Sequence, residues 1–306
     1  MINTWNKTAV LGGDGRQLSA ARRLAVPGHE VAVWGLEGTA AAFGGAVRTL
    51  DWRDAVRGAG AVLLPLPVSG DGVRINVQPS PQSADPPELR FTHLLEALTL
   101  EHRVFAGRIP PNFKTAAEER GIQLHDYSEY ELFQIRNALP TAEGAIEIAL
   151  HELPVTLAGT PAAVIGHGRI GKVLARLLCA MGAKVTVAAR KSVDLNWIAL
   201  EGGRPHRIET VNGISSLEEL CDCRVIFNTV PHWLFTRAVL EALRRDVLIV
   251  DLASAPGGVD PQAAADCGVR VIRALALPGK CAPETAGEII ADTLIDMMAR
   301  EGVAPI

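Results

Sequence analysis

The residues that most clearly indicate chemistry are six in a row, Gly166-His167-Gly168-Arg169-Ile170-Gly171, with the glycine spacing of a dinucleotide-binding loop. An apolar run at 162–165 precedes them and a helically spaced run at 172–178 follows, which gives the order strand, glycine turn, helix. The first glycine permits a tight turn, the second lets backbone approach a pyrophosphate, and the third lets helix and strand pack closely. The N–H groups at the start of the helix attract phosphates. We therefore expect dinucleotide contacts from Gly166, Gly168, Arg169, Ile170 and Gly171.

A basic cluster, Arg190-Lys191-Ser192, follows the next apolar strand at 185–189. Sites that prefer NAD usually place Asp or Glu at this point, where the carboxylate binds the ribose 2′-hydroxyl. A guanidinium, an ammonium and a hydroxyl suit a 2′-phosphate instead, because charge-assisted contacts to phosphate are strong. The cluster predicts NADP as cofactor, with NAD as the alternative if Arg190 is only a solvated charge at the strand end.

Two further segments follow strands of the same half of the chain, and ligands of open α/β sheets bind beyond the carboxyl ends of strands. We expect Thr229, Val230 and Pro231 to lie beside the cofactor ribose. In the segment 252–257 the expected contacts are Leu252 and Ala253 to the cofactor, Ser254 as a catalytic hydroxyl, and Pro256 and Gly257 to a flat substrate ring.

Candidate substrate contacts in the first half of the chain also follow strands. Arg16 is placed to bind a substrate carboxylate in a bidentate manner, and Ser69 and Gly70 can offer a hydroxyl and an N–H to the same anion. The alternatives are a surface arginine at a helix start and a plain turn. The turn Gly12-Gly13-Asp14-Gly15 is expected to line a cleft between domains, the alternative being a second nucleotide site.

A helical pattern from about 128 to 152 is expected to be interrupted at Leu139-Pro140, with Thr141 at the start of its second piece. Facing the hinge there, Thr141 is predicted to bind substrate and Glu143 to handle a proton, the alternative being an ordinary helix cap. His167 and His232 are the histidines near the predicted cofactor. Neither has an obvious acidic neighbour in the sequence, so we expect no essential histidine.

Apolar strands alternate with helical segments along both halves of the chain, which predicts an α/β fold with parallel sheets. We expect two doubly wound, Rossmann-like domains with an interdomain cleft: an N-terminal substrate-side domain of residues 1–135 plus 284–306, and an NAD(P)-binding domain of residues 136–283. The segment 78–87, with four prolines in ten residues, is predicted to be an irregular loop.

Composition excludes several classes of function. A net charge of −4 gives no basic surface for nucleic acid, and no apolar run approaches the roughly 20 residues of a membrane span. The five cysteines lack the spacing of a disulfide framework or of a metal site, so we predict reduced thiols and no metal. The N-terminus shows no signal peptide pattern, which favours a cytoplasmic protein, and a homo-oligomer is compatible with the sequence.

Several motifs in order resemble one family. The string at 139–144, the glycine loop, Asp251-Leu252-Ala253-Ser254 with Pro256-Gly257-Gly258, and the segments at 277–279, 282–283 and 285–287 are similar to the dipicolinate synthase A subunit of spore-forming bacteria, as are Gly12-Gly13-Asp14 and Arg16-Gln17. More distantly, the layout is similar to alanine and D-2-hydroxyacid dehydrogenases.

The resemblance implies an NAD(P)-linked oxidation of a dihydrodipicolinate-type ring to dipicolinate in sporulation, beside a flavoprotein-like B subunit. The ring would lose a hydride and a proton and become aromatic. Pro278-Gly279-Lys280 stands where hydroxyacid dehydrogenases carry a catalytic histidine, which argues against alcohol oxidation. The chain departs from the family pattern at Ala255, where a larger or basic residue is expected, and at Lys280 and Cys281. Two alternatives remain: an amino-acid or 2-hydroxy-acid dehydrogenase, and a cofactor-presenting subunit inactive without its partner.

Overall fold

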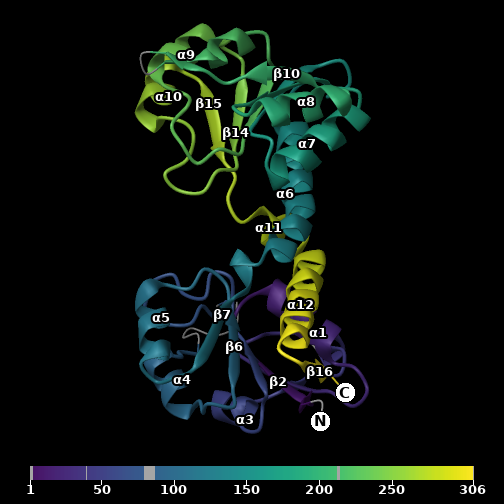
Figure 1. Ribbon diagram of the computed structural model, residues 1–306, viewed down its shortest axis with the longest axis vertical. Helices are drawn as coiled ribbons and strands as arrows, with labels where there is room; N and C mark the ends of the chain where they lie inside the picture. The colour runs from purple at the N-terminus through teal and green to yellow at the C-terminus, as the bar shows by residue number, and fades with distance from the viewer. Residues whose placement is uncertain (1–2, 39, 79–86, 212–213, 306) are drawn as a thin grey trace. The chain divides into compact units, whose positions relative to one another are not determined.

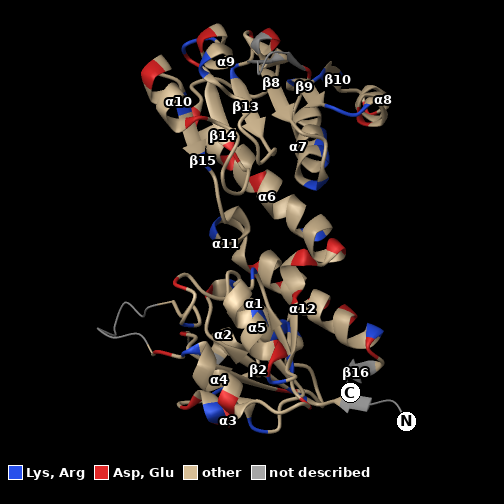
Figure 2. Ribbon diagram, turned by 60° about the vertical axis from the view of Figure 1, so that its left-hand side comes forward, with Lys and Arg blue, Asp and Glu red and all other residues tan. Residues whose placement is uncertain are grey.

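The computed structural model describes residues 3–38, 40–78, 87–211 and 214–305 and divides the chain into two compact units (Figure 1). Unit 1 comprises Met1–Asn137 and Ala282–Ile306, and unit 2 comprises Ala138–Cys281. The predicted loop at 78–87 lies almost entirely outside the described residues. Lys and Arg, like Asp and Glu, are scattered over the helices and loops of each unit (Figure 2).

Unit 1 contains a parallel sheet of six strands in the order β4-β3-β2-β5-β6-β7. The strands are β2 (Lys7–Leu11), β3 (Glu30–Trp34), β4 (Val47–Arg48), β5 (Ala61–Leu63), β6 (Arg103–Ala106) and β7 (Gln123–Asp126). The apolar runs of the four central strands, β3, β2, β5 and β6, are buried on both faces, as a parallel sheet requires, whereas the edge strand β4 is exposed. A small separate pair joins β1 (Asn3–Trp5) to β16 (Val303–Pro305).

Two helices cover one face of this sheet, α1 (Gly15–Leu24) and α12 (Pro283–Arg300), which lie side by side (Figure 1). The other face carries α3 (Trp52–Val56), α4 (Phe91–Ala97) and α5 (Pro111–Glu118), and the short α2 (Ala40–Phe43) follows β3. A Cβ at Gly287 of α12 would lie 2.2 Å from the Arg16 carbonyl oxygen. Glycine at that position therefore lets the two helices approach this closely.

Unit 2 contains a second parallel sheet in the order β10-β9-β8-β13-β14-β15. The strands are β8 (Pro161–Ile165), β9 (Lys184–Ala189), β10 (Arg204–Arg207), β13 (Val225–Asn228), β14 (Leu248–Asp251) and β15 (Arg270–Arg273). One face packs on α6 (Glu131–Glu152), α7 (Arg169–Ala180), α8 (Ser192–Leu200) and α11 (Leu277–Cys281). The other packs on α9 (Arg237–Ala242), α10 (Pro261–Cys267) and the 3-10 helix η2 (Ser216–Leu220), which follows the antiparallel pair of β11 (Thr210–Val211) and β12 (Ile214–Ser215). The two sheets confirm the predicted α/β class with two Rossmann-like domains.

The expected interruption at Leu139-Pro140 is wrong, because α6 runs unbroken from Glu131 to Glu152 with Pro140 inside it, after the 3-10 helix η1 (Tyr127–Glu129). An internal proline costs about 3 kcal/mol in a free helix. Here tertiary contacts outweigh that cost. Beyond the proline, buried alanines of α6 pack into the core of unit 2, and the Cys281 thiol donates to the Pro140 carbonyl at 3.3 Å. Thr141 is therefore in the middle of a helix and caps nothing.

No helix among the described residues is long and apolar enough to cross a membrane. Within the same residues, no group of His, Cys, Asp and Glu side chains is arranged to hold a metal ion.

Candidate functional site

The glycine loop joins β8 to α7 and places its three glycines in different roles. Gly166 has φ +97°, and its N–H donates to the Ala188 carbonyl at 2.8 Å, which ties the turn to β9. A Cβ at Gly171 would lie 2.0 Å from the Gly166 carbonyl oxygen, so a side chain there would break the turn. Gly168 has an ordinary φ of −84°, and a Cβ there would meet nothing within 4 Å. The loop is therefore open on the side of Gly168, next to the N–H groups of the first turn of α7, where a phosphate fits.

The basic cluster at the end of β9 gains a third cation from the neighbouring edge strand. Arg190, Lys191 and Ser192 are exposed. Arg207, the last residue of β10, donates to the Ser192 hydroxyl at 2.9 Å and to the Arg190 carbonyl at 3.4 Å. The sequence interpretation missed Arg207, although the parallel register that pairs it with Ala189 could have located it.

A buried polar network at the ends of three adjacent strands fixes the segment 252–258. Asn228, Asp251 and Arg273 end β13, β14 and β15, and the register places them in one row. The Asp251 carboxylate is fully buried, accepts hydrogen bonds from Asn228 Nδ2 at 2.8 Å and from Ala253 N and Gly258 N at 3.2 Å each, and forms an ion pair with Arg273 Nη1 at 3.2 Å. Such a carboxylate is held in place because each lone pair faces a hydrogen-bond donor.

The network decides which part of that segment faces solvent. Gly257 and Gly258 are buried against it, since a Cβ at Gly257 would lie 1.7 Å from Arg273 Nη1 and one at Gly258 1.9 Å from Asn228 Nδ2. The turn closes with a hydrogen bond from the Gly257 N–H to the Ser254 carbonyl at 2.8 Å. Ser254, Ala255 and Pro256 form its exposed tip, and the Ala255–Pro256 peptide is cis.

Thr229 links this network to the glycine loop. Its hydroxyl and its N–H both donate to the Ile165 carbonyl, at 2.8 and 3.0 Å. A Cβ at Gly166 would lie 2.5 Å from the Thr229 hydroxyl oxygen, so the two segments touch. The carboxyl edge of the unit 2 sheet thus brings together the glycine loop, residues 229–231 and residues 252–254, since β8, β13 and β14 are neighbours.

Arg16 in unit 1 is an internal ion-pair partner and not the solvated surface arginine of the alternative interpretation. Its guanidinium is 11% exposed, donates to both carboxylate oxygens of Asp14 and reaches the Leu66 carbonyl at 2.5 Å. Burial acts to raise the pKa of Asp14, but the hydrogen bonds and charge of Arg16 outweigh it and hold that pKa below its usual value. Arg16 Nη1 makes no hydrogen bond to the described residues, which leaves one face of the fork for a ligand.

The turn at 12–15 does not have the features of a second nucleotide site. Asp14 caps α1 by accepting from the Arg16 N–H at 2.9 Å, and the Gln17 side chain accepts from the Asp14 N–H at 3.1 Å. A carboxylate therefore already occupies the N–H groups that a phosphate would need, and its charge repels an anion.

Ser69 and Gly70 belong to a tight loop after β5. The Ser69 hydroxyl donates to Asp71 Oδ1 at 3.2 Å and accepts from the Gly72 N–H at 2.9 Å. Backbone and side-chain hydrogen bonds from Arg74 hold the pKa of Asp71 well below its usual range. The hydroxyl is engaged within its own loop, as in the plain-turn alternative, and Gly70 is exposed.

The structure does not bring Thr141 or Glu143 to the glycine loop. Thr141 is buried within α6, and Glu143 lines a shallow groove with Leu177, Ala180 and Met181 at the C-terminal end of α7. The glycine loop lies at the opposite end of this 12-residue helix, ~18 Å away at 1.5 Å per residue.

His167 has the acidic neighbours that the sequence did not reveal. Its side chain is fully buried, with Nε2 3.3 Å from a Glu201 carboxylate oxygen and Nδ1 3.7 Å from one of Asp194. Both carboxylates come from α8 or its end, so the α7–α8 packing creates this arrangement. The expectation that His167 lacks an acidic partner is therefore wrong.

The fold and this edge define a two-domain protein of the Rossmann type shared by dehydrogenases. An L-alanine dehydrogenase structure, 14% identical with a TM-score of 0.63 over 96% of this chain and 90% of that one, shares the fold. The family model for the N-terminal domain of the dipicolinate synthase A subunit matches residues 7–128.

Full-length comparisons identify the family. The dipicolinate synthase A subunit of Bacillus subtilis (strain 168) is 31% identical over 294 residues, 96% of each chain. The crystal structure of the corresponding protein, the dipicolinate synthase A subunit from Bacillus halodurans, is 30% identical, with a TM-score of 0.85 over 98% of this chain and 99% of that one. The chain belongs to the family of dipicolinate synthase A subunits, which confirms the resemblance carried by the motifs.

Proposed function

We propose that this chain is the nicotinamide-binding subunit of a dipicolinate synthase, which oxidises a dihydrodipicolinate-type ring to dipicolinate together with a second subunit in the cytoplasm of a sporulating cell. Family membership supports the reaction. The observation that carries the cofactor role is the convergence of the glycine loop, Thr229 and the segment 252–254 at one sheet edge. The open side at Gly168 and the N–H groups of α7 fit a pyrophosphate.

NADP is the proposed cofactor, because Arg190 and Lys191 follow β9 at the place expected for the adenosine ribose and Arg207, which also lies 3.9 Å from Glu209, binds the neighbouring Ser192. Arg190 and Lys191 are exposed, and Arg207 holds Ser192 in place. A 2′-phosphate offers each cation a charge-assisted partner, whereas the 2′-hydroxyl of NAD gives them none.

Titration of the isolated chain with both dinucleotides tests this assignment. Arg190→Ala is expected to weaken NADP binding about tenfold, or ~1.4 kcal/mol, and to leave NAD binding within about twofold. Arg245→Ala, an exposed arginine just before β14, is the matched control. An equal loss for both dinucleotides would show that Arg190 does not read the 2′-phosphate.

In the proposed oxidation the ring would lose a hydride, which a bound nicotinamide would accept, and a proton to solvent or a nearby base, and the gain of aromaticity would drive the reaction. The cofactor supplies hydride acceptance when bound. The Asp251 network holds the exposed tip of Ser254, Ala255 and Pro256 in place, so this tip can pack against a flat ring without rearranging. We assign Ser254 a hydrogen bond to the substrate during proton loss. Pro256 and Gly257 would shape the surface on which the substrate ring lies. Proton transfer by Glu143 remains a prediction with no contact in its favour.

A second function is favoured by the state of Arg16, whose Nε and Nη2 are already bound to Asp14 and the Leu66 carbonyl, so that only Nη1 remains for a substrate carboxylate. The chain would then present NADP to its partner and show no activity alone. Dipicolinate absorbance separates the two proposals, measured with the isolated chain and after co-expression with the partner subunit. Formation by the isolated chain rules out the presenting role, and no dipicolinate in either case rules out the synthase function.

A further inference from the structure

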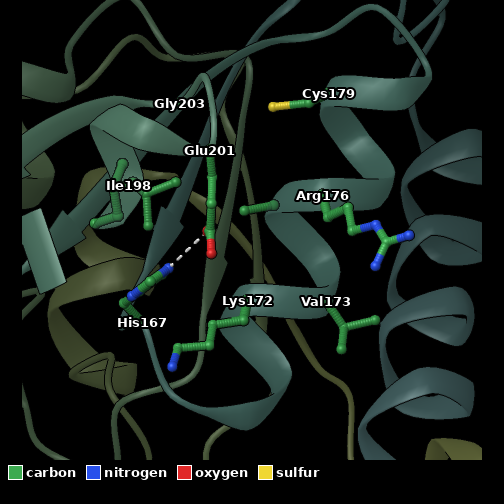
Figure 3. Close-up of a pocket in the computed structure, with 10 residues that line it drawn as sticks. His167, Lys172, Val173, Arg176, Cys179, Ile198, Glu201 and Gly203 are labelled. Atoms are coloured by element: carbon green, nitrogen blue, oxygen red, sulfur yellow. Dashed lines mark hydrogen bonds and ion pairs between the residues drawn. The ribbon is translucent and has the colours of Figure 1, made fainter. Parts of the chain in front are cut away.

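A cavity of about 470 Å³ lies between α7 and α8, on the face of the unit 2 sheet that these two helices cover (Figure 3). Its walls are mostly apolar and are formed by Val173, Ala175 and Cys179 of α7, by Val187 of β9 and by Ile198 of α8. The volume is that of a pocket for a small molecule.

One end of the cavity is polar and incompletely paired. The fully buried His167 reaches Glu201 through Nε2 at 3.3 Å, and its Nδ1 makes no hydrogen bond within the described residues. Lys172, an exposed residue at the mouth of the cavity, extends toward the same end (Figure 3) and has no hydrogen-bond or ion-pair partner in the described part of the chain. Lys172 and Glu201 thus carry opposite charges around one space without pairing with each other.

This cavity adjoins the proposed cofactor edge at His167 of the glycine loop, but it does not include the residues proposed to bind the cofactor. The cofactor contacts are the N–H groups at the start of α7 and the cluster at 190–192, none of which lines the cavity. The α7 residues that line the cavity are spread along one side of the helix as far as Cys179. A ligand here would lie between the two helices, beneath the edge where the strands end.

We propose that the cavity binds a small zwitterion with an apolar body, of the chemical class of an apolar α-amino acid. Its carboxylate would pair with Lys172, its ammonium group with Glu201, and its side chain would lie along Ala175, Val187 and Ile198. A lone anion would face Glu201 and a lone cation would face Lys172, while a neutral apolar molecule would leave Lys172 without a partner. A zwitterion satisfies both charges and buries apolar surface.

Alkylation of Cys179 reports occupancy without any assay of activity. Cys179 lines the cavity, and Cys221 is exposed outside it. The chain is treated with N-ethylmaleimide, and both sites are followed by peptide mass mapping. At about 10 mM, which nearly saturates a site with a millimolar Kd, L-leucine or L-phenylalanine is expected to slow alkylation of Cys179 at least threefold and to leave Cys221 unchanged.

Two analogues of leucine test the need for both charges. Leucinamide lacks the carboxylate and 4-methylpentanoate lacks the ammonium group, so neither is expected to protect Cys179. No protection by either amino acid, or equal protection by an analogue, overturns the proposal.

Variants assign the two contacts. Lys172→Met and Glu201→Gln are each expected to abolish protection. Arg176→Met is the control on the same helix: Arg176 also lines the cavity, but its guanidinium points away from Cys179 and Glu201 (Figure 3), so this variant is expected to retain protection. The buried Cys223 reacts only when the chain opens, so its continued resistance to alkylation verifies folding of each variant. Protection that survives both substitutions contradicts the proposed contacts.

Discussion

Asp251→Asn is the sharpest test of the network behind the segment 252–258, because the substitution keeps the shape and removes the charge. The carboxylate accepts from Asn228 and Ala253 at one oxygen, and its other oxygen accepts from Gly258 and forms an ion pair with Arg273. An amide accepts at one position only. In either orientation its NH₂ group therefore opposes two donors in a site that water does not reach.

The expected loss of stability follows from those contacts. Two buried donors without acceptors cost about 1–3 kcal/mol each, and breaking a buried ion pair costs roughly 3–5 kcal/mol. Because Arg273 is 39% exposed and keeps part of its hydration, we expect about 3 kcal/mol for the unfolding of unit 2.

Native-state hydrogen exchange measures this change locally, at the amides of β13 and β14, and so separates unit 2 from unit 1. Asp246→Asn, an exposed carboxylate just before β14, is the control and is expected to change exchange little. A loss at Asp251 below about 1 kcal/mol, or one equal to the control, would refute the stabilising role of the network. NADP binding is expected to weaken in the same variant, because the Ala253 N–H loses its acceptor.

Three further outcomes are expected. Gly168→Ala should leave the melting temperature unchanged, since its Cβ meets only open space, and should weaken dinucleotide binding at least tenfold. Gly171→Ala should lower both the melting temperature and the affinity for the dinucleotide. A lower melting temperature in Gly168→Ala would contradict these separate roles of the two glycines. Burial lowers the pKa of His29 from its usual 6.5, so the unfolded state binds the proton more readily. The stability that neutral His29 contributes is complete above pH 6.5 and is lost as pH falls through its lower folded-state pKa. The urea midpoint of unit 1 should therefore drop between about pH 7.5 and 5.5, and it should drop less in the His29→Gln variant. Gly287→Ala should destabilise unit 1 by about 1–3 kcal/mol, because the methyl group would overlap the Arg16 carbonyl, and thermal unfolding with no shift would argue against the close helix contact.

The sequence predicted the features that depend on local spacing. The glycine loop, the strand before it and the helix after it lie within about twenty residues, and each glycine role follows from backbone geometry that neighbours impose. The apolar strands and the parallel sheets were equally predictable, since a strand buried on both faces needs a continuous apolar run.

Tertiary structure decided how residues far apart in sequence complete the site. Asn228, Asp251 and Arg273 form a network because the register of three parallel strands aligns their last residues, and the same principle brings Arg207 to Ser192. Arg16 is paired internally because the turn of Asp14 folds back on it. Packing on both sides of Pro140 keeps α6 continuous against its own propensity. The sequence by itself thus determined where backbone can approach a ligand, while strand register and helix packing decided which charges are fixed and which remain free to bind one.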